Sequence, residues 1–145
     1  IFKNNRRLIS VGSGFESKNS RSKQSSKLLI WGLTNFDTIK IAEKRVPIDS
    51  LEVWLGTKKH IPVYTIEDVY KTVQKARKRY LKAIIQYNGP IKAPIKKDDQ
   101  VGKLKIYFKD ELFKEYNLYA SENIKKVNIF SRLIKYINFL IWDDV

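Results

Sequence analysis

Few backbone conformations are open to the segment YNGPIKAPIKKDDQVGKLKIY at residues 87–107. Apolar and polar side chains alternate from position 91 to position 96, which is the period of a strand with one face in water. Pro90 and Pro94, four residues apart, exclude a helix here. Because Pro94 cannot donate a backbone hydrogen bond, the strand is predicted to be an edge strand or to be interrupted there. A polar turn at 97–100 and a second alternating run at 103–108 complete a predicted β-hairpin.

Alternation also predicts strands on both sides of this hairpin. Apolar side chains occupy every second position near residues 51–55, and residues 61–63 form another apolar run that Pro62 interrupts. A further strand is predicted at 112–119, after a turn at 109–111. The region from about 41 to 126 is therefore predicted to be an antiparallel β domain.

The run GPIKAPIKK at 89–97, followed by VGKL at 101–104, resembles the C-terminal domain of the low-molecular-weight penicillin-binding proteins. These proteins are D-alanyl-D-alanine carboxypeptidases that trim bacterial cell-wall peptides. A second segment, SSKLLIWGLTNF at 25–36 with Arg21 before it, resembles the helix that ends the catalytic domain of this family. Gln24 and Leu33 stand where the family has an acidic and an aromatic residue. With RLISV at 7–11, the resemblance spans most of the chain.

The resemblance implies a mainly β fold in three parts. Residues 1–38 would be the last strand and helix of a truncated α/β catalytic domain, with the strand at 6–11. The helix is predicted to begin at Ser25 or Ser26, after a solvated serine- and lysine-rich connection. Residues 39–127 would form an antiparallel, β-sandwich-like C-terminal domain, and residues 128–145 an amphipathic helix.

Residues 65–87 are ambiguous on pattern alone. Their apolar side chains recur at helical spacing, and Thr65 with Asp68 imitates a capping box, so periodicity predicts a helix. The resemblance implies instead two strands, at about 69–73 and 81–87, joined by a basic turn at 75–79. We adopt the two strands.

The formal charge of +14 predicts an anionic partner: nucleic acid, acidic phospholipid or an anionic polymer. Lysine-rich coding bias explains the same excess equally well. Cysteine and methionine are both absent, so no disulfide or thiolate metal site is expected, and the chain is expected to be a fragment or a processed product. No apolar run approaches the ~20 residues of a membrane span.

The C-terminal segment has the pattern of a helix that lies on a membrane surface. Its apolar side chains occupy one arc, and cations with a tryptophan lie opposite. A helix that covers the domain's own core is the alternative, and the family's use of such a tail favours the membrane. The predicted membrane-binding residues are Ile129, Phe130, Arg132, Leu133, Ile134, Lys135, Ile137, Leu140, Ile141 and Trp142.

No catalytic residue is predicted in this chain. An acyl-serine hydrolase of this family needs Ser-x-x-Lys, Ser-x-Asn and Lys-Thr-Gly motifs from distant segments. The runs SRSK at 20–23 and SKN at 17–19 overlap in one loop, and KTV at 71–73 lacks the glycine. His60, the only histidine, is interpreted as a surface residue. The pairs Asp98-Asp99 and Asp143-Asp144 are interpreted as turn and tail residues, so neither metal nor cofactor is expected.

Two functions remain open at this point. The first is the C-terminal part of a serine-type D-Ala-D-Ala carboxypeptidase. Its partners would be peptidoglycan pentapeptides, through the missing catalytic part, and the periplasmic face of the bacterial inner membrane, through the tail. The second is a basic β-rich module that binds nucleic acid through tyrosines such as Tyr64 and Tyr70 among the cations. We favour the first, with no nucleic-acid partner, because the basic residues are spread along the whole chain.

Overall fold

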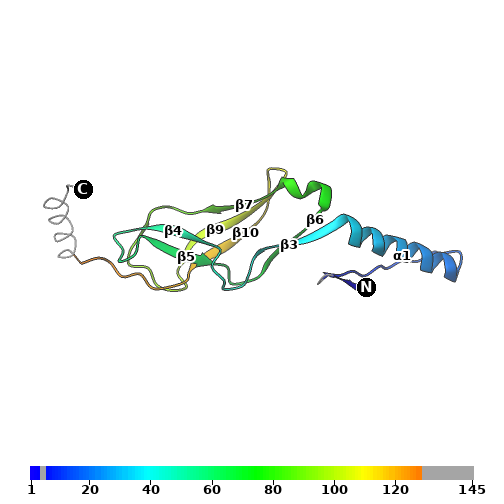
Figure 1. Ribbon diagram of the computed structural model, residues 1–145, viewed down its shortest axis with the longest axis horizontal. Coiled ribbons are helices and arrows are strands. Elements are labelled where there is room, and N and C mark those ends of the chain that lie inside the picture. The colour runs from blue at the N-terminus through cyan, green and yellow to red at the C-terminus, as the bar shows by residue number, and fades with distance from the viewer. Residues whose placement is uncertain (4–5, 129–145) are drawn as a thin grey trace, which may run out of the picture.

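The computed structural model describes residues 1–3 and 6–128. Helix α1 (Lys18–Asn35) lies at one end of the molecule, and an elongated β domain extends from it (Figure 1). The chain leaves the β domain at the end opposite α1. The β domain therefore separates the N-terminal segment from the point at which the C-terminal segment begins.

The largest sheet has six strands in the order β7-β9-β10-β5-β4-β8. All neighbouring strands are antiparallel except β4 and β8, which are parallel. The mainly β, antiparallel fold class predicted from the sequence is confirmed. The strands of this sheet, in chain order, are β4 (Asp49–Trp54), β5 (His60–Tyr64), β7 (Leu81–Gln86), β8 (Ile91–Lys92), β9 (Gln100–Phe108) and β10 (Glu111–Ala120).

A second antiparallel sheet pairs β3 (Phe36–Ala42) with β6 (Val69–Gln74) and connects α1 to the larger sheet. The six-residue 3-10 helix η1 (Lys75–Tyr80) then joins β6 to β7. The two strands predicted within residues 65–87 are confirmed. In β6 Val69 and Val73 are buried and Lys71 between them is partly buried, whereas Tyr70 and Thr72 are exposed, so the side chains alternate with a period of two.

The core lies inside the curl of the six-stranded sheet. Alternate residues of its strands are buried, and each buried Val, Leu or Ile side chain contributes about 1.5–3 kcal/mol by leaving water. Gly102 of β9 marks a close approach, because a Cβ there would lie 2.9 Å from the Gln86 carbonyl oxygen and 3.7 Å from Leu51 Cδ1. Strands β4 and β9 are thus near each other although they are not neighbours in the sheet. The buried core side chains on these strands are Leu51, Ile61, Val63, Leu104, Ile106, Leu118 and Ala120.

The hairpin predicted for residues 91–108 is wrong. Strand β8 ends at Lys92 and pairs in parallel with β4, through Val53 and Ile91, and β9 pairs with β7 and β10. The backbone after β8 is already hydrogen-bonded: the Ala93 amide donates to the Trp54 carbonyl, and Ile95 exchanges hydrogen bonds with Ile124. The predicted interruption at Pro94 and the edge position are confirmed, since β8 is the last strand of the sheet.

The N-terminal segment differs from the prediction in two respects. Its strand covers only β2 (Arg6–Arg7), which pairs with β1 (Phe2–Lys3). Helix α1 begins at Lys18 and not at Ser25, because the Ser17 hydroxyl accepts a hydrogen bond from the Ser20 amide at 3.1 Å and caps an earlier first turn.

Helix α1 packs on little of the described chain. Gly32 is its one buried residue, and Arg6 donates hydrogen bonds to the carbonyls of Gly32 and Phe36. Leu28 and Trp31 are 53% and 51% exposed. Phe36, whose ring centroid lies 5.1 Å from that of Trp31, is partly buried.

Candidate functional site

The predicted membrane-binding residues, 129–142, lie outside the described residues, so their role stays a prediction. In the described part of the chain no helix is both long enough and apolar enough to cross a membrane.

The motif-like residues noted in the sequence have structural roles. Ser17 caps α1, and the hydroxyls of Thr72 and Thr38 share a hydrogen bond of 2.8 Å across the β3–β6 pair. The Asp99 carboxylate accepts a hydrogen bond from the Lys96 amide at 2.7 Å, and His60 is an exposed residue at the start of β5. Within residues 1–3 and 6–128, no three His, Asp or Glu side chains gather closely enough to hold a metal ion.

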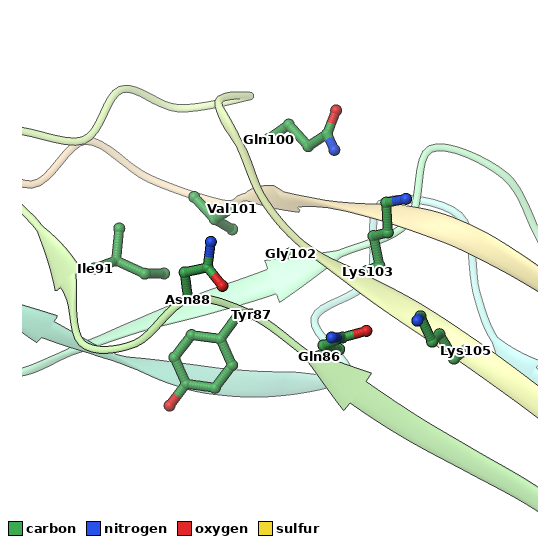
Figure 2. A pocket seen from close by; sticks show the side chains of 9 residues that line it. All are labelled: Gln86, Tyr87, Asn88, Ile91, Gln100, Val101, Gly102, Lys103 and Lys105. Atoms are coloured by element: carbon green, nitrogen blue, oxygen red, sulfur yellow. The ribbon is translucent and has the colours of Figure 1, made fainter.

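The surface of the β domain has an open polar cleft where β7 ends beside β9 (Figure 2). Its volume is about 590 Å³. Strand β9 provides one wall, and the end of β7 with the loop that follows provides the other. The residues that line it are Gln86, Tyr87, Asn88, Ile91, Gln100, Val101, Gly102, Lys103 and Lys105.

The two lysines of this cleft differ in their partners. Lys103 Nζ donates a hydrogen bond to Glu115 Oε1 at 2.6 Å. That hydrogen bond, with the positive charges of Lys103 and Lys105, holds the pKa of Glu115 below its ordinary value. Lys105 lies opposite Glu115 in the β9–β10 ladder, and no acidic side chain of the described residues lies within 4 Å of it. Lys105 is therefore the cation of the cleft that remains available to a ligand.

The lining of the cleft suits the binding of a polar ligand. Its three carboxamides can each donate and accept hydrogen bonds, and Lys105 can pair with an anion. The lining contains no serine, histidine or carboxylate. The cleft can hold a polar ligand with hydroxyl, amide or carboxylate groups.

The sequence prediction missed this cleft. The sequence pattern predicts Gln100 in a turn and Gln86 at the end of a strand, and neither prediction brings the two side chains together. One signal was present: Lys103 and Lys105 alternate with Leu104 and Ile106, which are buried, and this alternation predicts a wet face on β9. The pairing of β7 with β9 is what adds the carboxamides to that face.

Fold and surface together define a mainly antiparallel β domain with an open polar cleft at its surface. Residues 36–126 match the family described as penicillin-binding protein 5, C-terminal domain. The chain belongs to this family, as its motifs predicted.

Known relatives support the assignment. The chain is 35% identical over 132 residues to the D-alanyl-D-alanine carboxypeptidase DacD of Salmonella typhimurium. The aligned region covers 90% of this chain and 34% of that protein. It is 31% identical over 134 residues to DacD of Escherichia coli, covering 92% of this chain and 34% of the relative. The crystal structure of penicillin binding protein 5 from Haemophilus influenzae resembles it with a TM-score of 0.59 at 25% identity, over 76% of this chain and 32% of the other. The chain thus spans about a third of the length of its curated relatives.

Proposed function

We propose that this chain is the C-terminal part of a serine-type D-Ala-D-Ala carboxypeptidase that acts in peptidoglycan synthesis and remodelling. The whole protein would remove the terminal D-alanine from peptidoglycan pentapeptides through an acyl-serine intermediate, at the periplasmic face of the inner membrane. In this proposal residues 1–38 end the catalytic domain, residues 39–127 are a spacer, and residues 128–145 are a peripheral membrane anchor. The relatives named above are carboxypeptidases by name, which supports the activity assigned to the whole protein.

The observation that carries the spacer role is the placement of the two ends of the β domain. Helix α1 and the start of β3 lie at one end of the long axis, and the orange stretch of the chain that follows β10 leads to the other (Figure 1). A domain connected in this way holds what precedes it at a distance from whatever binds the tail. The exposure of Leu28 and Trp31, which are three residues apart and so lie on one face of α1, supports a further partner surface there, because contiguous exposed apolar side chains mark interaction sites.

The tail is tested by co-sedimentation with vesicles that contain anionic lipid. We expect the intact chain to bind and a chain that ends at Lys126 to lose binding, since the apolar arc and the cations of the tail are then absent. Replacing Leu133 and Ile137 by Asp should weaken binding more than replacing Arg132 and Lys135 by Gln, because apolar burial contributes roughly 25 cal/mol per Å² and is little affected by salt.

Equal binding by the intact and truncated chains would rule out the anchor. A nucleic-acid module gives the opposite pattern, in which the cations dominate and loss of the tail matters little. The same four proteins, titrated with single-stranded RNA, separate these two functions.

A further inference from the structure

Helix η1 carries a dense group of positive charges. Four of its six residues, KARKRY, are cationic, and none of the six is buried. We refer to Arg77, Lys78 and Arg79 as the η1 cation cluster. Neighbouring like charges repel each other and oppose folding, so such a group has an electrostatic cost.

The η1 cation cluster lacks the acidic partners that cations have elsewhere on this surface. Lys40 pairs with Glu43 and Lys82 with Asp110, each at 2.6 Å. Lys75, at the start of η1, lies 3.9 Å from Asp37. In the described residues no acidic side chain lies within 4 Å of Arg77, Lys78 or Arg79. Their charge is therefore available to an external anion.

The cluster is also held in place by its surroundings. The Arg79 guanidinium lies 4.9 Å from the centre of the Tyr80 ring and donates a hydrogen bond of 2.9 Å to the Tyr80 hydroxyl. The Leu81 amide donates to the Lys78 carbonyl, and the Lys109 amide donates to the Tyr80 carbonyl at 3.1 Å. Both hydrogen bonds lie at the C-terminal end of η1, and at its other end β6 is paired with β3 up to Gln74. A backbone held in this way loses less freedom when a ligand binds, which favours affinity.

The position of η1 indicates which anion it meets. The green helical turn lies at the α1 end of the β domain, away from the point where the chain leaves toward its tail (Figure 1). A lipid surface bound by the tail would lie at the opposite end of the domain. Peptides that end in D-alanyl-D-alanine carry a terminal carboxylate, and the peptide left after removal of one D-alanine carries one too. A wall with many such peptides is a polyanion at the end where a catalytic domain would work.

We propose that the η1 cation cluster binds the carboxylates of cell-wall peptides and so keeps the protein on the polymer. Guanidinium groups suit this ligand because they bind carboxylates with two parallel hydrogen bonds. The proposal rests on the proposed function, which supplies the polymer, and it adds a binding site on the accessory domain.

The test is co-sedimentation of the intact chain with purified peptidoglycan sacculi. The variant Arg77→Gln/Lys78→Gln/Arg79→Gln should bind about tenfold more weakly, since each lost cation removes charge-assisted hydrogen bonds to carboxylates. The control Lys59→Gln/Lys92→Gln/Lys125→Gln removes the same charge from exposed lysines at the far end of the domain and should bind within about twofold of the parent chain. Blocking the carboxylates of the sacculi as neutral amides should remove the difference between the parent chain and the cluster variant.

Equal loss in the two triple variants would reduce the effect to net charge and overturn the proposal, as would full binding of the cluster variant. Unchanged binding to amidated sacculi would exclude carboxylates as the ligand. All six positions are exposed, so both variants should keep the circular dichroism spectrum of the parent chain. The vesicle test of the tail remains separate: if the cluster variant loses vesicle binding and keeps sacculus binding, the cluster binds lipid and the carboxylate site is wrong.

Discussion

Glu115 has the clearest electrostatic role of any single residue near the cleft. The hydrogen bond from Lys103 is the main cause of its lowered pKa. A carboxylate whose pKa is lower in the folded state adds stability above its unfolded pKa, and this contribution disappears as the pH falls through the folded value. Because both side chains are about two-fifths exposed, water screens the pair and the effect on stability is small.

We therefore expect an NMR titration to give Glu115 a pKa below its ordinary value. In Lys103→Met the pKa of Glu115 should rise toward its ordinary value, because the main cause of the lowering, the hydrogen bond from Lys103, is lost. Lys92→Met removes a lysine that makes no ion pair with Glu115 and should leave it unchanged. An unaltered Glu115 pKa in Lys103→Met would show that the ion pair does not form in solution.

Among the elements, α1 gives the sharpest test of a helix boundary. Ser17→Ala should reduce helix stability by about 1 kcal/mol, since the Ser20 amide loses its capping acceptor. Ser22→Ala, inside the helix, should slightly increase helicity, because alanine has the higher helix propensity. Far-ultraviolet circular dichroism measures both changes. If the helix began at Ser25, Ser17→Ala would have no effect on the spectrum.

Local pattern predicted most of the strands but not how they pair. The alternation in β9 and β10 indicates which side chains face the core, and the burial of Leu104, Ile106 and Leu118 agrees with it. Alternation does not encode the partner, and so β8 was wrongly paired with β9. In the structure the partner of β8 is β4, which is distant in the chain.

The cleft could not be predicted for the same reason. Its carboxamides come from Gln86, Asn88 and Gln100, which belong to two strands and a loop. They meet only because β7 lies beside β9 and Gly102 allows the two backbones to approach. The basic turn after β6 was predicted, but its lack of acidic neighbours becomes visible only in three dimensions.

At the scale of the whole molecule, the chain should be catalytically inert by itself. We expect neither covalent labelling by a fluorescent penicillin nor release of D-alanine from a pentapeptide, because the family's three catalytic motifs are not found in the sequence. Gel fluorescence and a D-alanine assay measure these outcomes, with a full-length D-alanyl-D-alanine carboxypeptidase as the positive control. Stoichiometric labelling of any serine would contradict the prediction that the chain is inert.

The placement of the two ends of the β domain also has a mechanical consequence. Strands β4, β5, β9 and β10 run roughly along the long axis that separates α1 from the exit of the chain (Figure 1). If the tail is fixed and the N-terminal part is bound to a wall that moves, the tension follows the strands and does not peel them apart. Many inter-strand hydrogen bonds then share the load at once, so the domain can act as a stiff tether between two surfaces that drift relative to each other.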